Sequence, residues 1–191
     1  ADMKNAFALA LSFLAAPALA LDTERGAVNV TAVATGLNEP WAVAAMPDGG
    51  LLVTERDGTL QLIRDGRARK ASGTPRVAAR GQGGLLDITL ARDFARTRTL
   101  FRTYARRQGS GSGTALAAAE LSADGSRLVN LHDLFESAPG GSGGRHFGSR
   151  VVEGRDGTLF VTIGDRGDRP SAQDRSLHNG SIVRVNRDGT V

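Results

Sequence analysis

Short β-rich runs separated by tight turns recur along most of the chain, and this pattern constrains the fold more than any other feature. Leu51–Thr54 and Thr59–Ile63 are two such runs, and the turn dipeptide Asp57-Gly58 lies between them. Asp-Gly dipeptides tolerate the positive backbone angles that hairpin turns require. Runs this short, with turn signals about every 8–12 residues, predict an all-β sandwich, barrel or propeller. The 25 glycines fit a turn-rich protein, and a hydrophobic content of 40% is enough to form a core.

An internal repeat favours the propeller among these folds. Asp48–Thr54 (Asp-Gly-Gly-Leu-Leu-Val-Thr) matches Asp156–Thr162 (Asp-Gly-Thr-Leu-Phe-Val-Thr), and the two segments lie 108 positions apart. That separation accommodates two propeller blades of about 50 residues each. A blade is one small sheet whose faces are buried only against its neighbours in the ring.

The first 20 residues have the pattern of a secretory signal peptide. Lys4 supplies a short positive region, Ala6–Ala16 is apolar, and Pro17–Ala20 contains an Ala-x-Ala cleavage pattern. An N-terminal membrane anchor that is never cleaved is the alternative. No later apolar run is long enough to span a bilayer. We therefore expect a signal peptide at residues 1–20 and a periplasmic or secreted domain at residues 21–191, without a membrane span.

Composition argues against several kinds of partner and site. The net charge is +4, but the basic residues are scattered among acidic ones rather than gathered in one stripe. Trp41 and Tyr104 are the only tryptophan and tyrosine, so the chain has no aromatic platform on which bases could stack. We therefore expect no nucleic-acid partner. The absence of cysteine excludes disulfides, thiolate zinc sites and thiol nucleophiles, and no other set of metal ligands stands out.

Two glycine-rich segments carry the candidate site residues. His146 follows a glycine-rich loop and precedes a strand–turn–strand pattern, where loops commonly present functional groups on a rigid scaffold. Histidine is the usual general base near neutral pH, because its unperturbed pKa is about 6.5. A structural histidine bonded to a neighbouring carbonyl is the alternative. Gln82 lies among Gly81, Gly83 and Gly84, which allow the backbone to approach a ligand closely, although an ordinary loop before a strand fits the same spacing.

The ordered set of motifs is similar to that of the PQQ-dependent sugar dehydrogenases, of the soluble glucose dehydrogenase and aldose sugar dehydrogenase type. The similarity extends over essentially everything after the signal peptide. Its most specific parts are Gly-Gln-Gly-Gly-Leu-Leu-Asp at 81–87 and His-Phe-Gly-Ser-Arg at 146–150. The supporting motifs are Gly-Leu at 36–37 with Pro-Trp at 40–41, Val-Thr-Glu-Arg at 53–56, Gly-Asp-Arg-Gly at 164–167, Ala-Gln-Asp at 172–174 and Gly-Ser-Ile-Val-Arg-Val-Asn at 180–186.

This resemblance implies a fold, a reaction and roles for three residues. The fold is a six-bladed β-propeller, with PQQ in the mouth of the central channel and a calcium ion that holds and polarises it. The substrate is a small sugar, whose anomeric hydroxyl loses its proton to His146 while hydride passes to the quinone, and an external electron acceptor reoxidises the cofactor. Gln82 matches a glutamine near substrate and cofactor, and Asp165 matches an acidic position close to the same site. Arg145 departs from the soluble glucose dehydrogenases, which carry an acid there, and this favours the aldose type.

The length of the chain fits only part of such a ring. Residues 21–191 provide for about three blades of about 50 residues each. We therefore expect the N-terminal part of a longer enzyme, with most PQQ and calcium ligands beyond Val191. We also expect apolar sheet faces and strand edges to be left open. Two other functions are open: a metal-dependent lactonase on a similar propeller, and a non-catalytic propeller that binds carbohydrate or protein.

Overall fold

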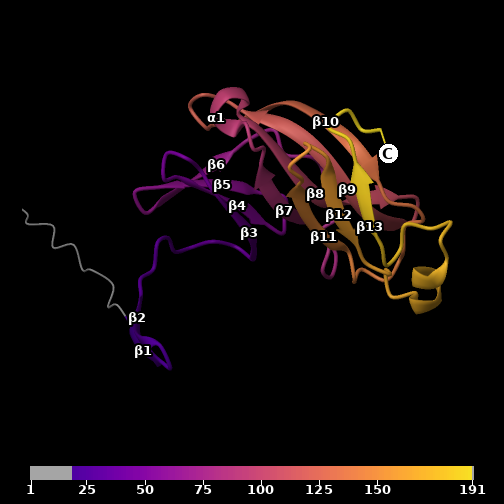
Figure 1. The fold of residues 1–191 in the computed structure, drawn as a ribbon, viewed down its shortest axis with the longest axis horizontal. Coiled ribbons are helices and arrows are strands. Elements are labelled where there is room, and N and C mark those ends of the chain that lie inside the picture. The colour runs from indigo at the N-terminus through magenta and orange to yellow at the C-terminus, as the bar shows by residue number, and fades with distance from the viewer. Residues whose placement is uncertain (1–18, 191) are drawn as a thin grey trace, which may run out of the picture. The chain divides into compact units, whose positions relative to one another are not determined.

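A computed structural model describes residues 19–190 and divides them into two units, which are described separately (Figure 1). The first unit extends to Thr35 and contains an antiparallel hairpin of β1 (Leu19–Thr23) and β2 (Gly26–Val30). The predicted signal peptide at residues 1–20 lies almost entirely outside the described residues. No helix within residues 19–190 is long and apolar enough to cross a membrane.

The second unit, from Gly36 onward, consists of three antiparallel sheets that follow one another along the chain (Figure 1). The first blade contains β3 (Pro40–Ala45), β4 (Leu51–Glu55), β5 (Leu60–Arg64) and β6 (Arg67–Ala71). The second blade contains β7 (Leu85–Leu90), β8 (Thr99–Gln108), β9 (Gly111–Leu121) and β10 (Leu128–Glu136). The third blade contains β11 (Gly148–Glu153), β12 (Leu159–Ile163) and β13 (Ile182–Val185). The all-β prediction, with about three blades present, is confirmed.

The second blade lies between the first and the third. In each blade the strands pair in chain order, and the first strand of the second blade, β7, contacts both β3 and β11. Side chains alternate between the faces of a strand, so neighbouring residues of β8 enter different cores. Leu100 packs with Leu52 and Leu60 against the first blade, whereas Phe101 packs with Val151 against the third blade. The hydrophobic core is therefore a series of layers between blades.

A threonine hydroxyl links each blade to the next. Thr54 Oγ1, on the second strand of the first blade, donates to the Leu86 carbonyl in the second blade at 2.6 Å. Thr103 Oγ1, on the second strand of the second blade, donates to the Ser149 carbonyl in the third blade at 2.7 Å. Both threonines are buried, and a buried carbonyl without a partner is costly. The two bonds therefore fix how neighbouring blades are positioned along their strands.

The same hydroxyls also accept a bond within their own blade. The ladder between the first two strands of every blade contains a one-residue irregularity, which frees a backbone N–H of the first strand. That N–H donates to the threonine Oγ1 in all three blades: Ala42 to Thr54 at 3.1 Å, Asp87 to Thr103 at 3.1 Å, and Arg150 to Thr162 at 3.0 Å. The arrangement is thus repeated three times, and Thr54 and Thr162 are the last residues of the sequence repeat.

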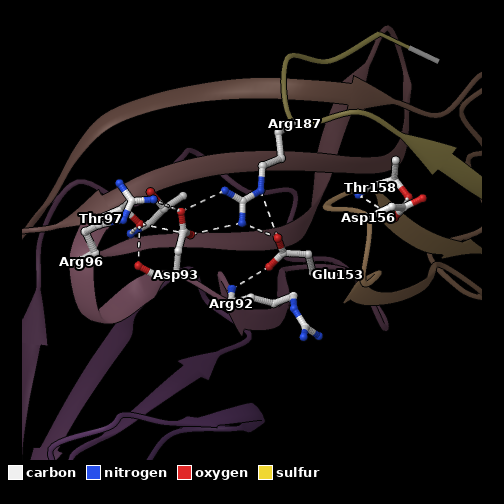
Figure 2. Close-up of polar contacts among 9 residues, drawn as sticks. Arg92, Asp93, Arg96, Thr97, Glu153, Asp156, Thr158 and Arg187 are labelled. Atoms are coloured by element: carbon white, nitrogen blue, oxygen red, sulfur yellow. Dashed lines mark hydrogen bonds and ion pairs between the residues drawn. The ribbon is translucent and has the colours of Figure 1, made fainter.

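An ion-pair network joins the second and third blades where β11 ends (Figure 2). Glu153 accepts a hydrogen bond from the backbone N–H of Arg92 at 2.6 Å and pairs with the guanidinium of Arg187. Arg187 also reaches Asp93 at 3.2 Å, and Asp93 pairs with Arg96 at 2.8 Å. The network holds the end of β11 that lies away from His146.

The segment Phe94–Arg98, which its polarity predicts to be a solvated loop, is different in the structure. Phe94–Thr97 form one helical turn, α1, and Arg98 ends it in a left-handed conformation with φ 57°. Phe94 is buried in the core between the first two blades. A single apolar residue in a charged segment gives no periodicity, so the prediction of a loop was wrong because tertiary packing decides this turn.

Candidate active site

His146 lies on the loop that leads into β11, and its backbone is held in an uncommon conformation. Its φ is 54°, in the left-handed region that residues other than glycine rarely adopt. The backbone N–H of His146 donates to Gln82 Oε1 at 2.7 Å. The His146 carbonyl accepts from the backbone N–H of Arg166 at 3.3 Å. Backbone strain of this kind costs about 1–3 kcal/mol and is retained where the surroundings enforce it, commonly at functional sites.

The glycines around Gln82 allow two parts of the chain to approach each other. A Cβ at Gly81, whose φ is 60°, would lie 2.2 Å from the Gly144 carbonyl oxygen. A Cβ at Gly83 would lie 2.7 Å from the ring of Phe147. The Gln82 N–H also donates to the Gly144 carbonyl at 2.8 Å. These glycines therefore seat the Gln82 loop against the His146 loop, a packing role that the sequence pattern did not reveal.

Asp165 orients the imidazole ring of His146. His146 Nδ1 lies 2.7 Å from Asp165 Oδ1, and the same oxygen accepts the Gly167 N–H at 2.8 Å. The bond from the Gly167 amide and, to a smaller extent, the bond from His146 lower the pKa of Asp165. The carboxylate is therefore ionised and can only accept hydrogen bonds. We therefore assign a proton to Nδ1, so that in the neutral ring the lone pair lies on Nε2. The structure thus brings Gln82 and Asp165 against His146; their roles in catalysis stay predictions.

Arg166 supports the same loop and was not singled out from the sequence. Its buried guanidinium lies over the ring of Phe147, 3.4 Å from the ring centroid, and also donates to the Arg145 carbonyl. A cation stacked on an aromatic face contributes about 2 kcal/mol or more where water is excluded. The one sequence signal was the position of Arg166 directly after Asp165.

His146 lines a cavity of about 470 Å³ together with Arg145, Gly167, Asp168, Arg169 and Pro170. Neither Arg145 nor Arg169 forms an ion pair within residues 19–190. Two guanidinium groups beside an oriented imidazole suit a ligand that carries carboxylates. Within the same residues, no group of three or more His, Asp or Glu side chains could hold a metal ion.

Asp87, the last residue of the Gly-Gln-Gly-Gly-Leu-Leu-Asp motif, does not contact His146. Its buried carboxylate accepts the Val151 N–H and Arg150 Nη1, both at 2.8 Å. Asp87 therefore anchors β11, the strand that follows His146, to the second blade. In this motif Gln82 thus contacts His146, whereas Asp87 holds the strand that follows His146.

Burial raises the pKa of Asp87 above 3.8, and this predicts a pH dependence of stability. At pH values between the pKa of Asp87 in the unfolded state and its higher pKa in the folded state, the folded state binds more protons than the unfolded state. Asp87 therefore makes the free energy of unfolding fall as pH rises. In Asp87→Asn the contribution is absent. We expect the free energy of unfolding of the wild type, minus that of Asp87→Asn, to decrease as pH rises from about 3.5 to 7. Urea unfolding at stepped pH measures it, and a difference that increases with pH would contradict it.

Comparisons with known proteins agree with this architecture. The glucose/sorbosone dehydrogenase family matches residues 37–191. The aldose sugar dehydrogenase YliI of Escherichia coli K12 is 38% identical over 188 residues, which is 94% of this chain and 51% of the relative. The crystal structure of the soluble aldose sugar dehydrogenase of E. coli, in the apo form, gives a TM-score of 0.76 at 39% identity, over 81% of this chain and 46% of that one.

A third relative is the PQQ-bound form of the aldose sugar dehydrogenase of Streptomyces coelicolor, with a TM-score of 0.73 at 32% identity. The match covers 82% of this chain and 47% of that one. The chain thus spans about half the length of the relatives it matches. Since the family match extends over most of the chain, the predicted membership is confirmed: this protein belongs to the glucose/sorbosone dehydrogenase family.

Proposed function

We propose that this chain carries the proton-accepting part of a PQQ-dependent aldose dehydrogenase, which oxidises the anomeric hydroxyl of a sugar to a lactone. Electrons leave to a quinone-type acceptor. The observation that carries the proposal is the pairing of His146 with Asp165 at 2.7 Å, on the wall of the cavity that Arg145 and Arg169 also line. The resemblance of sequence and structure to aldose sugar dehydrogenases supports it. From the predicted signal peptide, we propose that the protein acts in the periplasm or outside the cell.

His146, Asp165 and Gln82 have different roles in the proposed proton transfer. His146 Nε2 takes the proton of the anomeric hydroxyl, because Nδ1 is occupied by its bond to Asp165. Asp165 holds the ring in this tautomer and stabilises the imidazolium that forms, as a carboxylate does beside a catalytic histidine. Gln82 Oε1 holds the backbone of His146. The amide nitrogen of Gln82 is a donor that a sugar hydroxyl can use.

The described residues fit an anionic cofactor better than they fit a metal. PQQ carries carboxylates, and Arg145 and Arg169 are the groups of this chain that would hold them. When bound, PQQ supplies the acceptor for the hydride of the sugar carbon. Calcium prefers several oxygen ligands, and residues 19–190 contain no cluster of acidic side chains that provides them. We therefore assign no calcium ligand to this chain.

The test measures binding and activity separately. We expect PQQ, added with calcium, to raise the free energy of unfolding of the enzyme that contains this chain by about 2.7 kcal/mol at 100 times the PQQ dissociation constant. We expect the PQQ-loaded protein to reduce a dye acceptor with D-glucose or other aldoses. Methyl glucoside is the matched control, because its anomeric oxygen has no proton to give. Equal rates with the methyl glycoside, sugar oxidation without PQQ, or metal-dependent lactone hydrolysis would each contradict the proposed function.

A further inference from the structure

A second, smaller hollow lies beside the loops that carry Gln82 and His146. Its volume is about 90 Å³, and its walls come from segments 78–80, 107–112 and 141–144. None of these segments belongs to the apolar faces of the first and third blades that are open to solvent, where Val43 and Ile182 are 61% and 69% exposed. This chain therefore forms the hollow, whatever packs on those two faces.

Backbone contacts hold the walls of the hollow in place. The Ser112 N–H donates to the Gly141 carbonyl at 3.1 Å, and the Gly141 N–H donates back to the Ser112 carbonyl at 2.9 Å. A Cβ at Gly111 would lie 2.9 Å from the Gly141 carbonyl oxygen, so glycine allows this close approach. The Ala78 N–H donates to the Ala105 carbonyl at 2.8 Å and attaches the third wall to β8. The hollow is thus formed before any ligand binds.

The residues that line the hollow are suited to an anion. Arg80 and Arg107 both line it, and neither forms an ion pair within residues 19–190. Its other polar residues are Ser110, Ser112 and Ser142, and no aspartate or glutamate lines it. Guanidinium groups and hydroxyls donate hydrogen bonds to carboxylate and phosphate oxygens, and bonds between charged partners are the stronger kind. The hollow therefore favours a negatively charged group.

The hollow adjoins the place where the proposed function puts the sugar. Gly144 lines the hollow, and its carbonyl accepts the Gln82 N–H at 2.8 Å. His146 follows two residues later, and two residues of chain span at most about 7 Å. Sites for whole small molecules have volumes of about 300–1,000 Å³, whereas this hollow has only about 90 Å³. It is therefore of a size for one group of a ligand whose remainder lies outside it.

We propose that this hollow binds the carboxylate or phosphate group of an acidic sugar, whose anomeric hydroxyl reaches His146. The inference rests on the proposed function and narrows its substrate class to aldoses that carry a negative charge. Arg80 and Arg107 donate to the anionic group of the sugar. Arg145 and Arg169 stay available for the cofactor, because they line the separate cavity at His146.

The first test measures binding without catalysis. Inorganic phosphate is titrated by calorimetry into the enzyme that contains this chain, at low salt and without PQQ. We expect glucuronate and glucose 6-phosphate to compete with phosphate and glucose not to compete. In Arg80→Gln/Arg107→Gln the dissociation constant of this phosphate should rise about 100-fold, since each charged hydrogen bond contributes about tenfold or more. Phosphate that binds only at Arg145 and Arg169 would be unaffected by the double variant.

Arg76→Gln is the matched control for these variants. Arg76 is also an exposed arginine on the segment before Gln82, but it lines a different hollow. Phosphate should bind to Arg76→Gln as it does to the wild type. The inference is overturned if phosphate does not bind, or if the double variant binds it as tightly as Arg76→Gln does.

The second test compares substrates in the PQQ-loaded enzyme. We expect kcat/KM to be higher for glucuronate than for glucose, and we expect the ratio of the two values to fall about tenfold in Arg80→Gln, through the KM for glucuronate. The ratio should also fall at high salt, because salt screens exposed charges. Arg76→Gln should keep the wild-type ratio. Equal ratios in Arg80→Gln and Arg76→Gln would contradict the inference.

The two tests separate a failure of this inference from a failure of the proposed function. If glucose is oxidised with the help of His146 but acidic sugars have no advantage, the proposed function holds and the acidic substrate is wrong. If glucuronate displaces phosphate from the wild type but no sugar reduces the dye, the hollow binds anions and the proposed function is wrong.

Discussion

Replacing His146 with glutamine is expected to lower sugar-dependent dye reduction by the PQQ-loaded protein by about 10²- to 10⁴-fold. Glutamine keeps a polar side chain at this position, but its amide cannot accept the proton of the anomeric hydroxyl. The backbone bond from residue 146 to Gln82 does not involve the ring, so the loop should keep its place. Initial rates over a range of aldose concentrations measure the effect, which should fall on kcat rather than on KM.

Two controls separate this chemical role from a structural one. PQQ binding, followed by absorbance, should be unchanged in His146→Gln, since the variant leaves Arg145 and Arg169 in place. Asp165→Asn should also lose activity while PQQ binding is kept, because an asparagine amide can donate to Nδ1, which favours the tautomer with its proton on Nε2, and no longer stabilises the imidazolium. A His146→Gln protein that binds PQQ normally and oxidises aldoses at the wild-type rate would show that another group takes the proton.

Gly84→Ala is expected to destabilise the protein by about 3–5 kcal/mol, the largest stability effect that we predict for a single methyl group. The φ of Gly84 is 155°, and a Cβ there would lie 1.9 Å from the Arg56 carbonyl oxygen. That oxygen accepts the Leu85 N–H at 3.1 Å, and the Gly84 carbonyl accepts the Ala105 N–H at 2.8 Å. The backbone cannot withdraw from the clash without breaking these bonds. Urea unfolding of wild type and variant gives the difference.

Gly49→Ala is the matched control for Gly84→Ala. Gly49 also has a positive φ, 85°, but no atom lies within 4 Å of the Cβ that alanine would add. Its cost should be limited to the backbone conformation, about 1 kcal/mol. Equal losses in the two variants would mean that backbone conformation alone, and not the contact with Arg56, makes glycine necessary at position 84.

The course of the strands could be predicted from the sequence because turn chemistry is local. Asp-Gly dipeptides fix where hairpins end, and the repeat of Asp48–Thr54 at Asp156–Thr162 corresponds to β4 and β12, the second strands of two blades. The repeated threonine also has a structural meaning, since Thr54 and Thr162 occupy equivalent positions. The apolar faces expected to be open at the two ends of the unit are present as well.

The supports of the candidate site could not be predicted, because they are contacts between distant segments. The stacking of Arg166 on Phe147 depends on how two loops meet. The resemblance predicted that Asp165 lies close to the site, but not that it pairs with His146. The bonds from Thr54 and Thr103 end on backbone carbonyls. A carbonyl leaves no trace in composition or periodicity, since every residue has one.

The bonds from threonine hydroxyls to carbonyls all run in one direction along the series of blades, from the earlier blade in the chain to the later one. In each contact between blades, a threonine hydroxyl of one blade donates to a backbone carbonyl of the next blade. The bond therefore does not depend on the side chain of the residue whose carbonyl accepts it. Leucine receives the bond in one contact and serine in the other. Duplication or loss of a whole blade in a gene would therefore leave every remaining contact of the same kind. A protein built in this way can therefore gain or lose blades during evolution without a new kind of contact between them.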